Sequence, residues 1–235
     1  MNTAAKLLTE LVGTFLFLSV IALSGPMGQL APLAIGTALM VMVYMGGHVS
    51  GGHYNPAVSL GVFLRGKMTR AQLVTYWVCQ LAGGALAFGF GYLVSGHTPG
   101  IHPGAKVMAL QALAVEIVFT TALVLVVLNV AVTRATQGNS FYGLAIGFTI
   151  VVAAFAGGPI SGGAFNPAVG LGATLGTALF GGGSWSDLWL YLVGPLIGAG
   201  LAAVIHVVQV RGIEQALASP GGKPSPGWPA PIPEE

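Results

Sequence analysis

The stretch SGGHYNPAV, residues 50–58, returns as SGGAFNPAV at residues 161–169, with seven of the nine positions identical. Both copies place two glycines and an Asn-Pro pair in a chain that is otherwise mostly apolar. Proline is favoured in the first turn of a helix, and asparagine is favoured immediately before it. Each copy therefore predicts an irregular turn followed by the abrupt start of a helix, at Pro56 in the first copy and at Pro167 in the second.

The composition is that of a chain embedded in lipid. Of its 235 residues 54% are hydrophobic and only 6% are charged, and the mean hydropathy is +0.84. Soluble domains carry about 25% charged residues, so this chain has too few charges to cover a surface that faces water. The few Lys and Arg are scattered, which speaks against a nucleic-acid partner. A single cysteine excludes a disulfide framework or a thiolate metal site within one chain.

Six apolar segments approach the roughly 20 residues that a membrane-spanning helix needs. Two further apolar stretches, 56–65 and 167–178, cover only about half a bilayer, and both begin at the Asn-Pro pairs. The pattern predicts an all-α integral membrane protein with two re-entrant half-helices and six spanning helices, at 6–24, 31–49, 71–94, 108–132, 141–158 and 187–210.

The repeat extends well beyond the nine-residue motif. Residues 33–64 align with 144–175 without gaps, with 17 identities in 32 positions. The chain therefore consists of two homologous halves, each with three spanning helices and one half-helix. Because three is an odd number, the second half must enter the membrane from the opposite side. We expect a first repeat at 1–105, a second at 106–212 and a disordered proline-rich tail at 213–235.

The N-terminal segment is interpreted as the first spanning helix. Residues 1–25 resemble a secretory leader in having a lysine and an apolar run. However, Glu10-Leu-Val-Gly-Thr14 resembles Glu116-Ile-Val-Phe-Thr120 deeper in the chain, and a cleaved leader has no reason to match an internal helix.

The distribution of positive charge predicts the orientation of the chain. If the N-terminus is cytoplasmic, only Lys106 falls outside. The other seven positive residues then fall on the cytoplasmic side together with both termini: Lys6, Arg65, Lys67, Arg70, Arg134, Arg211 and Lys223. The short loops and the absence of a targeting leader favour a bacterial inner membrane.

Two half-helices that enter from opposite faces would meet at the membrane centre with their N-termini facing. Their partial positive ends repel cations, including hydronium. The side-chain amides of Asn55 and Asn166 are expected to offer NH2 donors to the lumen, and the glycine carbonyls before them to offer acceptors. This arrangement predicts a narrow passage for small uncharged molecules. An alternating-access carrier is disfavoured, because acidic or ligand-coupling residues are missing at the breaks.

The doubled Asn-Pro-Ala motif, the paired Glu-x-x-x-Thr sequences and the 3+3 repeat together resemble the aquaporin and aquaglyceroporin family. The resemblance covers roughly residues 5–210. It implies a pore in each monomer, a homotetramer in membrane lipid, and passive flux of water or small neutral solutes. It also implies that the pore centre is formed by Asn55, Pro56, Ala57, Asn166, Pro167 and Ala168.

A second constriction is implied at four positions that this family places at fixed distances from the two Asn residues. Carried over by spacing, these selectivity-filter positions are Ile35, Ala154, Gly163 and Val169. A shift of one residue would bring Phe155 to the filter instead of Ala154. The last position is usually arginine in the family, and valine supplies neither its charge nor its directed donors.

This departure predicts a wider and drier filter that passes urea, glycerol, hydrogen peroxide or ammonia. Two other outcomes stay open from the residues alone. An all-apolar ring favours dewetting, which would slow water, and the missing arginine is also compatible with an ion- or gas-conducting pore.

The remaining polar residues receive structural interpretations. Glu10 and Glu116 are expected to brace the re-entrant loops through hydrogen bonds rather than to relay protons, and His53 to line the cytoplasmic vestibule. His97 and His102 in an outer loop are too few for a metal site. Without a nucleophile–base pair, a metal cluster or a phosphate-binding loop, we expect neither an enzyme nor a cofactor.

Overall fold

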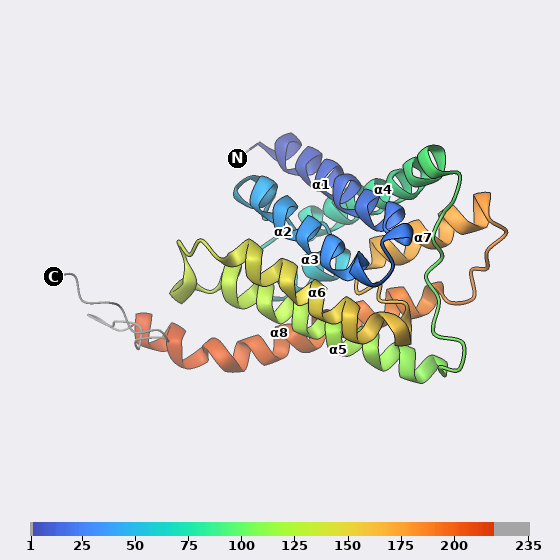
Figure 1. Cartoon of the computed structure of the whole chain (residues 1–235). Helices are drawn as coiled ribbons and strands as arrows, with labels where there is room; N and C mark the ends of the chain where they lie inside the picture. Colours follow the sequence, from blue (N-terminus) through green and yellow to red (C-terminus); the bar gives the residue numbers. More distant parts are fainter. Residues whose placement is uncertain (1, 219–235) are drawn as a thin grey trace.

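The computed structural model describes residues 2–218, and every regular element in that range is helical (Figure 1). Six helices are long and apolar enough to cross a membrane, and two shorter helices lie between them, which confirms the predicted fold. The elements are α1 (Thr3–Leu23), η1 (Gly25–Leu30), α2 (Ala31–Ser50), α3 (Pro56–Leu64), α4 (Arg70–Ser95), α5 (Ala109–Val127), η2 (Leu128–Val132), η3 (Arg134–Thr136), α6 (Tyr142–Ser161), α7 (Pro167–Phe180) and α8 (Leu188–Ala218).

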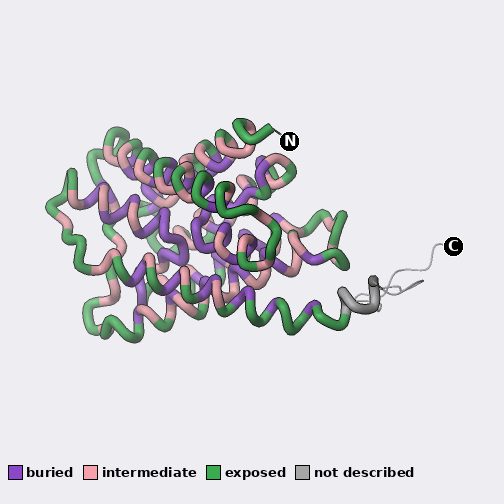
Figure 2. The backbone as a smooth tube through the Cα atoms, turned by 180° about the vertical axis from the view of Figure 1, so that it is seen from behind, coloured by how far each residue is buried: buried purple, intermediate pink, exposed green. Residues whose placement is uncertain are grey.

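The two halves pack in matching ways around the short helices. Helix α1 packs on α4 just as α5 packs on α8, and α2 packs on α6 between the halves. The half-helices cross over: α3 contacts α8, and α7 contacts α4. Figure 2 shows the buried backbone in the middle of the bundle and exposed residues along its outside. The two half-helices are therefore held inside a ring of spanning helices.

A glycine permits a close helix contact in each half. A Cβ on Gly83 of α4 would lie 2.7 Å from the carbonyl oxygen of Leu11 in α1. A Cβ on Gly198 of α8 would lie 2.7 Å from the carbonyl oxygen of Ile117 in α5. Since small residues let helix backbones approach closely in lipid, these glycines set the spacing of the two matching helix pairs.

We expect Gly83→Ala to lower the thermal unfolding temperature in detergent and to reduce the monodisperse fraction, because backbone cannot move aside as a flexible side chain can. Gly89→Ala on the same helix is the matched control, since a Cβ there meets nothing within 4 Å. Alanine is favoured over glycine in a helix by about 1 kcal/mol, so the control should be neutral or slightly stabilising. Equal behaviour of the two variants would contradict the close contact.

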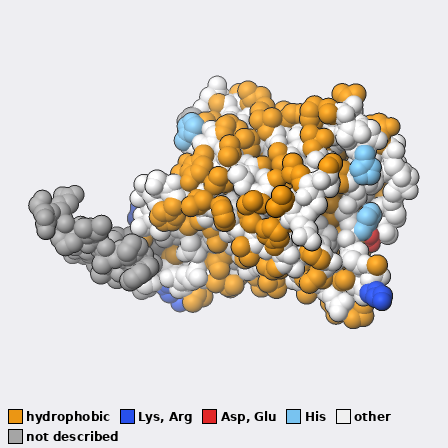
Figure 3. Space-filling view, viewed as in Figure 1, with side chains coloured by type: hydrophobic (Ala, Val, Ile, Leu, Met, Phe, Trp, Pro, Cys, Tyr) orange, Lys and Arg blue, Asp and Glu red, His pale blue; other side chains and the backbone are white. Residues whose placement is uncertain are grey.

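The outside of the bundle is apolar, as expected for a surface that faces lipid. Figure 3 shows hydrophobic side chains across the middle of one face and Lys or Arg side chains near its two ends. Helix α1 begins and α8 ends at the same end of the bundle (left in Figure 1). We call this the terminal end and the opposite one the far end.

Helix α8 extends further than the repeat boundary at residue 212. It continues to Ala218, through a segment that ends in the good helix formers Glu-Gln-Ala-Leu-Ala, and stops two residues before Pro220. The remainder of the predicted tail, residues 219–235, lies outside the described residues.

Candidate functional site

The half-helices begin where the Asn-Pro pairs predict. Asn55 precedes α3 with extended backbone, and its Oδ1 accepts a hydrogen bond from Ala57 N at 2.9 Å. Asn166 does the same for α7, accepting from Ala168 N at 2.9 Å. Both helices therefore start at the centre of the bundle with an Asn cap, and their positive dipole ends lie there.

The two Asn side chains also connect the two halves directly. Asn55 Nδ2 donates to the carbonyl oxygen of Phe165 at 2.9 Å, and Asn166 Nδ2 donates to that of Tyr54 at 3.0 Å. One hydrogen of each NH2 is thus engaged by the opposite loop, which leaves one per residue for the lumen.

The backbone before each half-helix is strained in the same way in both halves. Tyr54 and Phe165 have φ values of 47° and 48°, a left-handed conformation that is uncommon for residues other than glycine. Both side chains are fully buried. Such strain persists only where the surrounding contacts hold it. Here one buried carboxylate accepts hydrogen bonds from each loop.

Glu10 of α1 supports the first loop. Its Oε1 accepts from Ser50 Oγ at 2.6 Å and from His53 N at 3.0 Å. Its Oε2 accepts from Tyr54 N at 2.8 Å and from Gln80 Nε2 at 2.8 Å. Four donors on two oxygens are the surroundings that an ionised carboxylate requires when it is buried.

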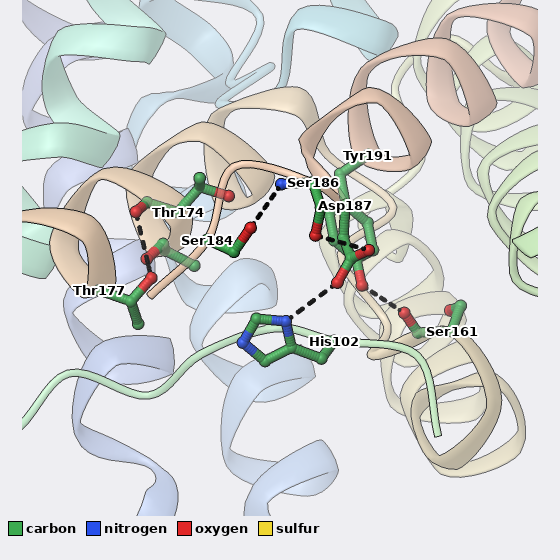
Figure 4. A network of polar contacts seen from close by, with 9 residues as sticks. His102, Ser161, Thr174, Thr177, Ser184, Ser186, Asp187 and Tyr191 are labelled. Carbon is green, nitrogen blue, oxygen red and sulfur yellow. Dashed lines mark hydrogen bonds and ion pairs between the residues drawn. The ribbon is translucent and has the colours of Figure 1, made fainter. Parts of the chain in front are cut away.

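Glu116 of α5 holds the second loop by three matching contacts. It accepts from Ser161 Oγ at 2.8 Å, from Ala164 N at 3.0 Å and from Phe165 N at 2.7 Å. The hydroxyl of Tyr191 donates to the carbonyl oxygen of Ser161 at 2.7 Å (Figure 4).

In the first half the hydroxyl of Tyr76 donates to the carbonyl oxygen of Ser50 at 2.8 Å, as Tyr191 does to Ser161 in the second half. Tyr76, Tyr191 and Gln80 are loop contacts that sequence reasoning did not find. The two tyrosines are 115 residues apart, whereas the aligned motifs are offset by 111, so only an alignment with a gap could have paired them.

A cavity of about 590 Å³ lies beside the two Asn residues, and loops from both halves border it. Three of the four predicted filter positions line it: Ile35, Ala154 and Gly163. Phe155 lines it as well, although half of its surface is exposed. The structure thus brings both Ala154 and Phe155, the two alternative filter residues of α6, to the cavity.

Val169 is not among the residues that line this cavity. Its side chain is 1% exposed and belongs to the buried core of the bundle. The family spacing places it in the filter, but valine is short, and here it packs into protein. The position that usually supplies an arginine thus contributes an apolar contact inside the core.

The wall of the cavity is mainly apolar. Its polar side chains near the centre are Asn55, Asn166 and His53, the last being 9% exposed. The apolar lining residues of α2, α3, α5 and α6 include Leu39, Val58, Leu123, Val127, Ile146 and Ile150.

The segment 96–108, between α4 and α5, crosses the far end of the cavity. Pro99 and Ile101 line the cavity, and His102 Nδ1 lies 3.1 Å from Asp187 Oδ2 near the start of α8 (Figure 4). Within residues 2–218 no group of three His, Cys, Asp or Glu side chains is placed to hold a metal ion.

Comparisons with known proteins agree with this geometry. The family described as "Major intrinsic protein" matches residues 1–206. The chain is 40% identical to Aquaporin-8 of Rattus norvegicus, over 82% of this chain and 76% of that one. It is 36% identical to Aquaporin NIP1-1 of Zea mays, over 83% of this chain and 71% of the relative.

The fold is also that of a solved structure, the aquaglyceroporin from Plasmodium falciparum, with a TM-score of 0.77 at 21% identity. That match covers 92% of this chain and all of the other. The sequence match over most of the chain, the shared fold and the paired Asn-capped half-helices lead to one conclusion: the chain belongs to the major intrinsic protein family.

Proposed function

We propose that this protein passes small neutral solutes in addition to water. The candidate solutes are urea, glycerol, hydrogen peroxide and ammonia. The family is one of passive membrane channels for water and small solutes, and the chain is a multi-pass membrane protein of that kind, not an enzyme. The observation that carries the finer proposal is Val169, which lies in the core where the family usually places an arginine.

The filter proposed here consists of Ile35, Ala154 and Gly163, which line the cavity, whereas Val169 does not line it. None of these side chains carries a charge or a hydrogen-bond donor, and two of the three lining residues are very small. A solute would meet donors at Asn55 and Asn166, where each amide retains one hydrogen for the lumen. Cation exclusion would then rest on the two helix N-termini at this point.

The surface of the bundle supports a proposed orientation, membrane and assembly of the protein. With short loops and six positive residues of the described range at the terminal end against Lys106 at the far end, we infer cytoplasmic termini and a bacterial inner membrane. Trp185 and Trp189, both about half exposed, would anchor the far-end interface. The apolar outside would serve both lipid contact and assembly into a homotetramer.

The filter proposal predicts that Ala154→Phe slows urea and glycerol more than water, because an aromatic ring would fill part of the cavity. We expect urea permeability of vesicles to fall at least about tenfold, which corresponds to about 1.4 kcal/mol of added barrier. Water permeability should fall less. Stopped-flow light scattering of reconstituted vesicles measures both.

Ala156→Phe is the matched control, because residue 156 is exposed on the same helix and is not part of the proposed filter. Wild-type vesicles that pass water but no larger solute would contradict the proposed solute range. A planar-bilayer current well above background would instead favour the alternative of an ion-conducting pore.

A further inference from the structure

A proline in α6 frees one backbone oxygen in the second half. Pro159 lies inside this helix, which continues to Ser161. In an α-helix each backbone N–H donates to the carbonyl oxygen four residues earlier. Proline has no N–H, so the carbonyl oxygen of Phe155 lacks the hydrogen bond that the helix would otherwise give it. Any other residue at position 159 would supply that bond.

The residues around this oxygen line the cavity. A helix carbonyl points toward the residues three and four positions further on, which places Phe155 O beside Gly158 and Pro159. All three residues line the cavity. A Cβ on Gly158 would meet nothing within 4 Å apart from its chain neighbours and its own helix backbone, so no described side chain covers this part of α6. The oxygen therefore faces the open space of the cavity.

The same oxygen lies beside the proposed filter. Ala154 directly precedes Phe155, and a Cβ on Gly163 would lie 3.1 Å from Gly158 Cα. Ile35, Ala154 and Gly163 offer no polar side chain. A solute at this level thus meets a backbone acceptor in a place where the side chains supply none.

The first half lacks this acceptor. At the offset of 111 between the halves, His48 takes the place of Pro159, and Gly47 takes the place of Gly158. His48 has a backbone N–H that can complete its helix. A Cβ on Gly47 would lie 3.3 Å from the ring of Tyr142, so this face of α2 is covered by a side chain.

Both helices nevertheless end in the same way. Gly51 N donates to Gly47 O at 3.0 Å, and Gly162 N donates to Gly158 O at 2.9 Å. The φ values of Gly51 and Gly162 are 97° and 93°. Since α2 reaches this ending without a proline in the matching position, Pro159 is not needed to end α6. What it adds in the second half is the free carbonyl.

We propose that the carbonyl oxygen of Phe155 is a hydrogen-bond acceptor of the filter, which selects solutes that carry a donor. The inference rests on the proposed channel function and deepens it. An NH2 group of urea, a hydroxyl of glycerol, ammonia or water replaces the missing helix bond as it passes. A molecule without a donor leaves the oxygen unsatisfied, which is unfavourable away from bulk water. Phe155 thus acts through its backbone, and Pro159 is the residue that makes this oxygen available.

Carbon-13 NMR tests the acceptor independently of flux. The chain contains a single Phe-Ala pair, residues 155–156, and a single Phe-Tyr pair, residues 141–142. Labelling the Phe carbonyl carbon together with the Ala or Tyr nitrogen therefore isolates one carbonyl at a time in the full-length protein in lipid vesicles. We expect the Phe155 signal to shift as urea is added. The Phe141 signal is the control and should stay in place, because its oxygen already accepts from Ala145 N at 3.0 Å.

Pro159→Ala should move the Phe155 signal to that of a bonded helix carbonyl and remove its response to urea. A Phe155 signal that ignores urea in the wild-type protein, or that moves no more than the Phe141 signal, would overturn the proposal. This test needs only the wild-type protein, so it stands even if the variant does not fold.

Solute flux tests the consequence. Pro159→Ala occupies the oxygen with an N–H and adds no larger side chain, so we expect urea and glycerol permeability to fall about three- to tenfold, the effect of one net hydrogen bond. Pro195→Ala makes the same change inside α8, none of whose described residues line the cavity, and should match the wild type.

Both variants must elute as monodisperse protein before they are compared. Wild-type flux in a folded Pro159→Ala protein would refute the role of the Phe155 oxygen. A wild-type protein that conducts nothing would instead refute the channel proposal, while the NMR result would still decide whether this oxygen binds solute.

Discussion

Val169→Arg should abolish most urea and glycerol flux while water flux persists. Val169 lies three residues after Asn166, in the first turn of α7, and is buried in the core. A guanidinium cannot remain in an apolar core without partners, so the longer side chain must extend toward the cavity. There it would add bulk, a charge and five directed donors. We expect urea permeability to fall more than about tenfold, equivalent to at least about 1.4 kcal/mol of barrier.

Val169→Met is the matched control for this experiment. It lengthens the side chain without charge and can remain in the core, so its urea permeability should stay within about twofold of wild type. Both variants must first elute as monodisperse protein. If a well-folded Val169→Arg protein passed urea at the wild-type rate, the valine would not set the solute range.

The double variant Glu10→Gln, Glu116→Gln should lose most of its stability and its flux. Each carboxylate accepts hydrogen bonds from two consecutive backbone N–H groups of a strained loop. A glutamine has one acceptor oxygen, so its NH2 would face an N–H donor. Hydrogen bonds to charged groups contribute about 1.5–3 kcal/mol each. We therefore expect a loss of about 3 kcal/mol per site, measured as a fall in thermal unfolding temperature.

Asp187→Asn makes the same chemical change at a partly exposed carboxylate near the far end. Its partner is His102, and exposed ion pairs contribute only about 0–1 kcal/mol, so thermal stability should hardly change. A double Glu→Gln variant that matched this control in stability and flux would show that the carboxylates do not brace the loops.

The fold could be predicted from the sequence because its decisive signals are local. Segment length and hydropathy locate the spanning helices, and Asn-Pro marks the start of each half-helix at the observed residue. The inverted repeat follows from counting three spans per half. The end of α8 was harder to predict, since the helix continues beyond the apolar span through 211–218 to Ala218.

The details of the site depend on contacts between distant helices, which spacing does not encode. Gln80 lies in an apolar helix, and its bond to Glu10 joins residues 70 positions apart. The burial of Val169 depends on the length of its side chain as well as its place in the motif. The cross-loop bonds of Asn55 and Asn166 needed both loops in place.

The most direct test of a pore for neutral solutes mixes reconstituted vesicles with a hyperosmotic urea solution and follows their volume by stopped-flow light scattering. A pore for neutral solutes predicts rapid shrinkage as water leaves, followed by reswelling much faster than in protein-free vesicles as urea enters. Reswelling at the rate of empty vesicles, with the protein shown to be folded and inserted, would contradict a pore for neutral solutes.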